Sequence, residues 1–190
     1  MRIIILILIF VNILALSAVS VGESAEFGNA ESLQYETETG GIVFTGTSGA
    51  EIGKISIPAL SIENEPLYYL PTRENLKKGV CMDGPEGGWQ IVGEKGRSMI
   101  SAHNDKAFRR LDKLKKGDSI FISMEYGDFE FRVSDIFIYR HGLDDWQEAV
   151  YENTEEYGLA IATCYPLNKR NTTGDRLVVR CNLLHENKMQ

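Results

Sequence analysis

Hydrophobic and polar residues alternate with a period of two along most of the chain after residue 51. Alternation of this kind predicts β-strands that bury one face, and a Tyr-Gly-Asp turn at 126–128 predicts that two of them form a hairpin. The first strand ends at Pro58, which suits an edge or first strand. The predicted strands are 52–57, 67–69, 98–103, 119–124, 129–133, 158–163 and 176–184.

Only short helices are predicted between these strands. Residues 72–78 have the composition of one or two helical turns that end at Gly79. The connection 142–153 is polar enough to carry another short helix, with Trp146 and Val150 facing inward. A third helix is predicted around an apolar series at i, i+3 and i+6, which consists of Phe108, Leu111 and Leu114. Many short strands with few helices favour a mainly β fold, either a barrel or a sandwich.

The chain begins with a hydrophobic segment. Residues 3–21 contain three polar residues only, and a helix of this length covers about 28 Å, close to the thickness of a hydrocarbon core. Arg2 before the segment and glutamates after it place the amino terminus in the cytoplasm and the remainder outside. Residues 1–21 are therefore either a signal peptide, cleaved after small residues at 18–20, or an uncleaved membrane anchor.

Composition divides the remainder into two parts. Residues 22–50 are rich in Gly, Ser, Thr and Glu and predict a flexible stalk, whereas residues 51–190 can bury one sizeable core. A short strand within the stalk is indicated at 42–44. The chain has 20 basic and 27 acidic residues, for a net charge of −7, and it has no extended basic cluster. This balance disfavours nucleic acid as a partner, because binding to phosphates needs a concentrated positive face.

Three reactive side chains each lie at one end of a predicted strand. Cys164 follows one apolar run, His103 ends another, and Arg176 opens the last. A thiol, an imidazole and a guanidinium at neighbouring strand tips are the groups that a thiol-nucleophile acyl transfer enzyme needs. Each also has a structural alternative: the cysteine as a small core residue, the histidine in a solvated loop and the arginine as an edge charge.

The other candidate residues are less specific. Three cysteines in an exported chain leave at least one unpaired, and either a Cys81–Cys181 or a Cys164–Cys181 bridge is conceivable. His141 and His185 have no acid or cysteine cluster at metal-ligand spacing, so we predict neither a catalytic role for them nor a metal or cofactor. The carboxylates that could orient the imidazole, or form turns, are Asp105, Asp128 and Asp175.

The order and flanking residues of these groups resemble the sortases, cysteine transpeptidases of bacterial surfaces. The resemblance covers residues 51–184, although Ala102 stands where glycine is common in the family. Tyr-Pro after the cysteine favours class D or a proteobacterial-type subclass. The motifs that carry it are Ile55-Ser56-Ile57-Pro58, Ser101-Ala102-His103, Gly117-Asp118-Ser119-Ile120, Ala162-Thr163-Cys164-Tyr165-Pro166 and Asp175-Arg176-Leu177-Val178-Val179.

The resemblance implies a closed eight-stranded β-barrel with the site at strand ends. It implies that Cys164 attacks a sorting motif similar to Leu-Pro-x-Thr-Gly, that His103 transfers protons, and that Arg176 stabilises substrate and oxyanion. The partners would be surface proteins with a C-terminal sorting motif and an amine from a cell-wall precursor or protein. The alternatives are a thiol peptidase that hydrolyses the same intermediate, and a non-catalytic binding module with the same fold.

Overall fold

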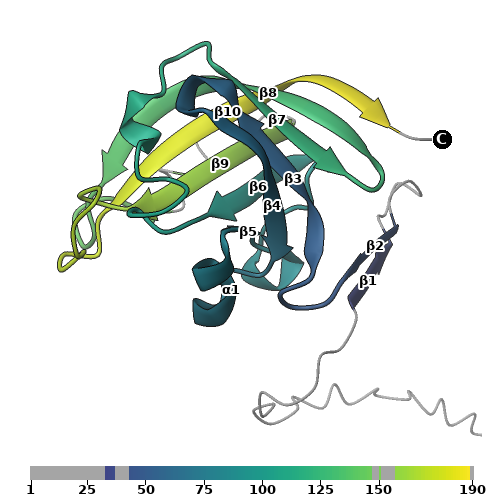
Figure 1. Ribbon diagram of the computed structural model, residues 1–190, viewed down its shortest axis with the longest axis horizontal. Helices are drawn as coiled ribbons and strands as arrows, with labels where there is room; N and C mark the ends of the chain where they lie inside the picture. Colours follow the sequence, from purple (N-terminus) through teal and green to yellow (C-terminus); the bar gives the residue numbers. More distant parts are fainter. Residues whose placement is uncertain (1–32, 37–42, 147–149, 151–156, 189–190) are drawn as a thin grey trace, which may run out of the picture.

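The computed structural model describes residues 33–36, 43–146, 150 and 157–188 (Figure 1). Short 3₁₀ turns at Pro58–Leu60, Pro85–Gly87 and Leu111–Lys113 connect some of the strands. The regular elements are β1 (Leu33–Glu36), β2 (Val43–Gly46), β3 (Glu51–Ile57), β4 (Ile62–Tyr69), α1 (Arg73–Lys78), β5 (Val80–Met82), β6 (Gly96–Ser101), β7 (Ser119–Met124), β8 (Gly127–Tyr139), β9 (Tyr157–Cys164) and β10 (Arg176–Lys188).

Strands β3 to β10 close into a barrel. Their order is β10-β8-β7-β3-β4-β5-β6-β9, and β10 completes the circle by pairing with both β8 and β9. Two neighbouring pairs, β4 with β5 and β6 with β9, are parallel, and the others are antiparallel. The expected eight-stranded barrel is therefore confirmed, and the predicted hairpin is β7 with β8.

Every second side chain along these strands points into the barrel and fills its interior. In the hairpin, Ile120, Ile122 and Met124 of β7 and Phe129 and Phe131 of β8 are all buried in one central cluster. The residues between them point away from this cluster, as the period of two predicts. β8 is longer than predicted and continues to Tyr139 as one of the two neighbours of β10.

A second cluster covers the outer face of β6, β9 and β10. In β9, Leu159 and Ile161 belong to the central cluster, whereas Ala160 and Ala162 belong to the second one, so the two clusters lie on opposite faces of the same strands. The predicted inward position of Val150 is confirmed, because this residue is fully buried here. We call this set the outer cluster; it contains Trp89, Met99, Tyr139, Val150, Ala160, Ala162 and Val178, with Phe137 and Trp146 packed against it.

The predicted helices are short. α1 begins after Thr72, whose hydroxyl accepts a hydrogen bond from the backbone N–H of Asn75, and it ends at Gly79 as expected. Of the helix predicted around Phe108, Leu111 and Leu114, the structure shows turns and one 3₁₀ turn. All three side chains are nevertheless buried in the central cluster, so the pattern identified the correct inner side.

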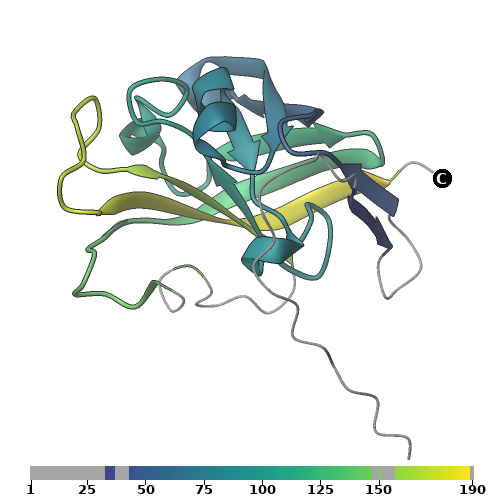
Figure 2. The ribbon, with the colours of Figure 1, turned by 90° about the horizontal axis from the view of Figure 1, so that it is seen from below.

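The part of the chain before the barrel is described only in pieces. β1 pairs with β2 in a two-stranded antiparallel sheet, which includes part of the strand expected at 42–44 (Figure 2). Among the described residues, no helix is long and apolar enough to cross a membrane. The predicted signal or anchor at 1–21 lies outside the described residues, as does most of the predicted stalk.

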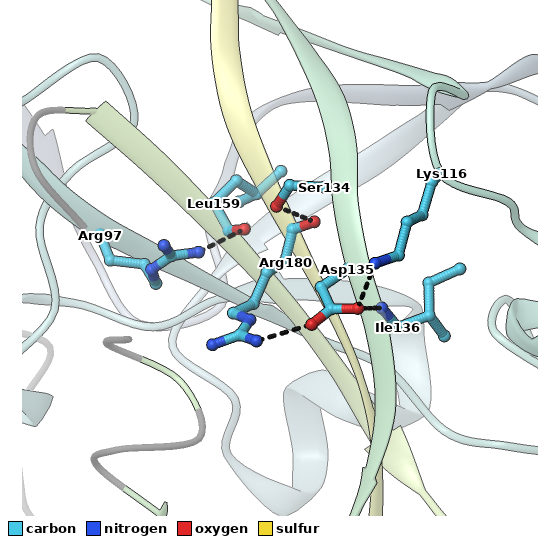
Figure 3. Close-up of polar contacts among 7 residues, drawn as sticks. All are labelled: Arg97, Lys116, Ser134, Asp135, Ile136, Leu159 and Arg180. Carbon is cyan, nitrogen blue, oxygen red and sulfur yellow. Dashed lines mark hydrogen bonds and ion pairs between the residues drawn. The ribbon is translucent and has the colours of Figure 1, made fainter. Parts of the chain in front are cut away.

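An ion pair joins β8 to β10 beside the outer cluster. Arg180 of β10 donates to the Asp135 carboxylate of β8 over 2.7 Å (Figure 3). The Arg180 guanidinium also lies 4.8 Å from the centre of the Phe137 ring. Lys116 lies 3.0 Å from the same carboxylate. Because Arg180 is four residues from Arg176 along an extended strand, this pair is about 13 Å from the candidate site and serves the fold.

Asp135→Asn is expected to weaken the dependence of stability on acid pH. The hydrogen bond from Arg180, and then that from Lys116, lower the pKa of Asp135. A carboxyl group whose pKa is lower in the folded than in the unfolded protein stabilises the fold at pH values above its unfolded-state pKa of about 4. This stabilisation is lost as the pH falls through the pKa of the group in the folded protein. Thermal unfolding between about pH 2 and pH 7 should therefore show a shallower acid decline in the variant. Asp112→Asn, which removes an exposed pair with Lys113, is the control. Equal slopes for wild type and Asp135→Asn would contradict this assignment.

Candidate functional site

The sheet register places Cys164 opposite Arg176. Cys164 is the last residue of β9 and Arg176 is the first of β10, and the two are directly paired in the antiparallel ladder. Side chains of directly opposed residues share one face of the sheet, with their Cβ atoms about 4.5–5.5 Å apart. On its other side Arg176 is paired with Tyr139 at the end of β8.

His103 lies just past the end of β6, and not within a strand as predicted. The parallel register pairs Ser101 of β6 with Ala162 of β9, and extending it by two residues aligns His103 with Cys164. The hydroxyl of Thr163 supports this extension, since it donates to the carbonyl oxygen of Ala102 over 2.7 Å. His103 is half-buried.

The two candidate residues within strands belong to the outer face of the barrel wall. Cys164 is two residues from Ala162, Arg176 is two residues from Val178, and Ala162 and Val178 are both in the outer cluster. These two residues therefore lie at the edge of the outer cluster and outside the barrel interior. The loops that flank them lie together at one end of the barrel in both ribbon views (Figures 1 and 2).

The loop between β9 and β10 holds the Arg176 guanidinium. One Nη1 nitrogen donates to the carbonyl oxygens of Gly174 and Asp175, at 2.7 and 2.9 Å. No other hydrogen bond to this guanidinium is present among the described residues, so its Nε and second Nη nitrogen are available as donors. The Asp175 carbonyl also accepts from the backbone N–H of Tyr165, which links the Arg176 loop to the residue after Cys164.

Asn171 shapes the turn that carries these carbonyl groups. Its Oδ1 accepts from the backbone N–H groups of Thr173 and Gly174, and its Nδ2 donates to the Asp175 carbonyl over 2.7 Å. Gly174 has a φ of +86°, and a Cβ atom there would lie 2.9 Å from the His141 ring. A side chain at this position would therefore displace the turn that seats the guanidinium.

The remaining candidates are not brought to His103. The carboxylate of Asp175 accepts from the backbone N–H of His141, and Asp128 pairs with Ser123 and Asn187 at the other end of the barrel. In the described part of the chain, none of the three candidate aspartates hydrogen-bonds the imidazole. His185 is exposed on β10 opposite Glu130, far from the site. The described residues contain no group of three or more potential metal ligands.

The structure separates Cys164 from the other two thiols. All three cysteines are free, and Cys181 is paired with Leu159, five residues along β9 from Cys164. That spacing is about 17 Å in an extended strand, too far for a disulfide. Cys81 and Cys181 are fully buried, and burial raises the pKa of Cys81 to about 11 and that of Cys181 further. Cys164 is the partly exposed thiol.

Iodoacetamide near neutral pH is expected to label Cys164 alone in the folded protein. The thiolate is the reactive form, and burial withholds both the thiolate and the reagent from Cys81 and Cys181. Peptide mass spectrometry after a short reaction measures the site of labelling. In denaturant all three cysteines should react, which is the positive control. Labelling of Cys81 or Cys181 at a rate similar to that of Cys164 in the folded protein would refute the expectation.

An apolar groove opens between β8 and the loop that follows Cys164, and none of the three candidate residues lines it. Its volume is about 510 Å³. Ile138 contributes exposed apolar surface there, at 40% exposure. The lining residues are Asp112, Ile136, Phe137, Ile138, Tyr165, Pro166, Leu167, Lys169 and Leu177.

Polar groups around the site were missed by sequence reasoning. Thr163 and Asn104 directly adjoin the two predicted residues, and Asn104 is buried with its amide pointing across to the Cys164 loop. The turn at Asn171 could have been predicted, because a sequence such as Asn-Thr-Thr-Gly at 171–174 is typical of a turn in which the asparagine side chain hydrogen-bonds the nearby backbone. Thr163 was singled out as part of the motif around Cys164, but the hydrogen bonds of Thr163 and Asn104 join separate segments, so no local pattern predicted them.

A sortase domain matches residues 55–184 of this chain, which include β9, most of β10 and all three candidate residues. The chain belongs to the sortase family. A sortase D of Bacillus subtilis is 27% identical over 136 residues, covering 72% of this chain and 65% of that protein. A sortase A of Bacillus anthracis is 28% identical over 120 residues, covering 60% and 51% respectively. The chain thus spans about half to two thirds of these relatives.

Solved sortase structures agree with the barrel. The structure of a sortase C from Clostridium perfringens superposes with a TM-score of 0.59 at 28% identity, covering 73% of this chain and 72% of that one. The family expectation and its barrel are therefore both confirmed, and the sortase D relative agrees with the class D resemblance.

Proposed function

We propose that this sortase is a transpeptidase that cleaves a sorting motif similar to Leu-Pro-x-Thr-Gly and transfers the acyl group to an amine. The observation that carries the proposal is the pairing of Cys164 with Arg176 across β9 and β10, with His103 aligned to Cys164 through the register of β6. Membership of the sortase family supports the general activity.

In the proposed reaction the Cys164 sulfur attacks the threonine carbonyl carbon of the motif. The N–H donors of Arg176 that the loop leaves available hydrogen-bond the oxygen as it gains negative charge. The carbon–nitrogen bond to glycine then breaks, and His103 gives a proton to the departing amine. The incoming amine attacks the thioacyl carbon, His103 accepts its proton, and the sulfur leaves as the thiolate.

The acceptor amine and the location of the enzyme are part of the proposal. The acceptor is an amine of a cell-wall precursor or of another surface protein. Residues 1–21 anchor the enzyme in the membrane or direct its export, with the barrel outside the cytoplasm. The charge asymmetry around this segment, with Arg2 before it and glutamates after it, supports that orientation.

Incubation of the barrel with a Leu-Pro-x-Thr-Gly peptide and an amine tests the proposal. A ligated product, identified by mass spectrometry, supports transfer. The free acid alone would indicate a thiol peptidase, in which water takes the place of the amine. Absence of both products across a library of sorting-like peptides would overturn the enzyme assignment and leave a binding module.

A further inference from the structure

The side chain of Asn104 joins the loop after His103 to the loop after Cys164. Its Nδ2 donates to the carbonyl oxygens of Pro166 and Lys169, at 2.7 and 2.9 Å. The backbone carbonyl oxygen of Asn104 accepts from the backbone N–H of Asn168 at 3.1 Å. Asn104 is 7% exposed, so these bonds are made where little water can replace them.

The residue type fits this position closely. A primary amide offers two hydrogens in one plane, and both are used on carbonyl groups three residues apart in the same loop. Aspartate would present a carboxylate oxygen to two carbonyl oxygens, and a buried alanine would leave both of them unsatisfied. The contacts span 62 and 65 residues of sequence, so they fix the relation between two separate segments.

These bonds enclose the two candidate reactive residues. His103 lies between Ala102 and Asn104, and Cys164 lies between Thr163 and Pro166. Ala102 is bonded to Thr163 on one side, and Asn104 is bonded to Pro166 on the other. The relative position of the two backbones is therefore held on both sides of the pair. Among the described residues no candidate carboxylate orients His103. The hydrogen bonds made by Thr163 and Asn104 on its two sides are therefore the contacts that can hold it in position.

We propose that Asn104 is a positioning residue that keeps the His103 imidazole in reach of the Cys164 thiol. This inference rests on the proposed function of those two residues. A shift of about 1 Å between reacting groups can lower a rate about 100-fold, which is the scale of effect expected when the Asn104 bonds are removed. Substrate contacts would remain, because the buried Asn104 side chain offers little surface to a substrate.

Asn104→Ala tests the proposal, with Asn168→Gly as the matched control. The side chain of Asn168 also bridges the two segments, by donating from Nδ2 to the carbonyl oxygen of Arg109 at 3.0 Å, but it is exposed and its partner is six residues beyond His103. Its φ of +56° makes glycine the suitable replacement. Asn104→Ala is expected to lower kcat about 100-fold with KM changed less than about two-fold, whereas Asn168→Gly should keep kcat within about two-fold.

The pH profile of Cys164 alkylation separates positioning from stability. Wild type, His103→Ala, Asn104→Ala and the double variant are compared by alkylation rate and by thermal unfolding. If Asn104 acts through His103, the profile of Asn104→Ala approaches that of His103→Ala, and the double variant adds nothing further. Asn104→Gln retains both donors on a longer arm, so it supplies the same comparison if the alanine variant does not fold.

The outcomes distinguish this inference from the proposed function. An alkylation profile of the folded Asn104 variants identical to wild type, with a lower unfolding temperature only, would overturn positioning, as would additive effects in the double variant. Ligation by wild type with unchanged kcat in Asn104→Ala also overturns it while the proposed function stands. Absence of ligation, with His103→Ala and Asn104→Ala altering alkylation alike, would overturn the proposed function and support positioning.

Discussion

Cys164→Ala is expected to abolish formation of the thioacyl intermediate and to lower the rate of peptide transfer by at least about four orders of magnitude. The sulfur forms the bond to the acyl group in the proposed reaction, and alanine has no atom that can replace it. The residue is half-buried at the end of β9, so the free energy of unfolding should change by less than about 1 kcal/mol. Mass spectrometry of the protein after incubation with peptide measures the adduct.

Cys181→Ala is the matched control for this substitution. It makes the same chemical change at a thiol that is fully buried in the central cluster. The control should lose stability because a small cavity is left, while the activity of the folded fraction stays near that of wild type. Transfer by Cys164→Ala above the rate of the uncatalysed reaction would show that the nucleophile is another group.

Arg176→Lys is expected to reduce kcat by about 100- to 1,000-fold, the usual cost of losing a donor to a developing oxyanion. The guanidinium is held by Gly174 and Asp175 through one nitrogen and keeps other N–H groups available. An ammonium group has three donors on a single atom, so it cannot bind both carbonyl groups and still present a planar pair of N–H groups to substrate. Steady-state ligation kinetics measure the effect.

Arg170→Lys makes the same replacement in the same loop at an exposed side chain, and it should leave kcat within about two-fold of wild type. Full activity of Arg176→Lys would show that the charge alone suffices or that the residue has no part in the reaction. A rise in KM with kcat unchanged would instead show that the contact is made equally in the bound substrate and in the transition state.

The sequence predicted the fold more completely than it predicted the site. Periodicity located the hairpin of β7 and β8 and the strands on both sides of the Cys164 loop, because each depends on local alternation of buried and exposed residues. Closure of the barrel came from the family resemblance. The pairing of β6 with β9 joins segments about 60 residues apart, and no local pattern encodes such a pairing.

At the site, the sequence identified the chemical groups but not what holds them. The thiol, imidazole and guanidinium could be singled out by residue type and by their places at strand tips. Their supports are carbonyl oxygens of Ala102, Pro166 and Gly174, which every residue has and which therefore leave no trace in composition. Sequence reasoning also placed His103 within the strand, whereas β6 ends at Ser101.

Two of the three cysteine thiols are buried in the barrel, and burial limits which thiols an oxidant in solution can reach. Peroxide can reach one thiol on each molecule, at Cys164. Two molecules can form a disulfide through this sulfur, but neither then has a second accessible thiol that could bond a third molecule. Mild oxidation should therefore produce reducible dimers and no larger disulfide-linked species.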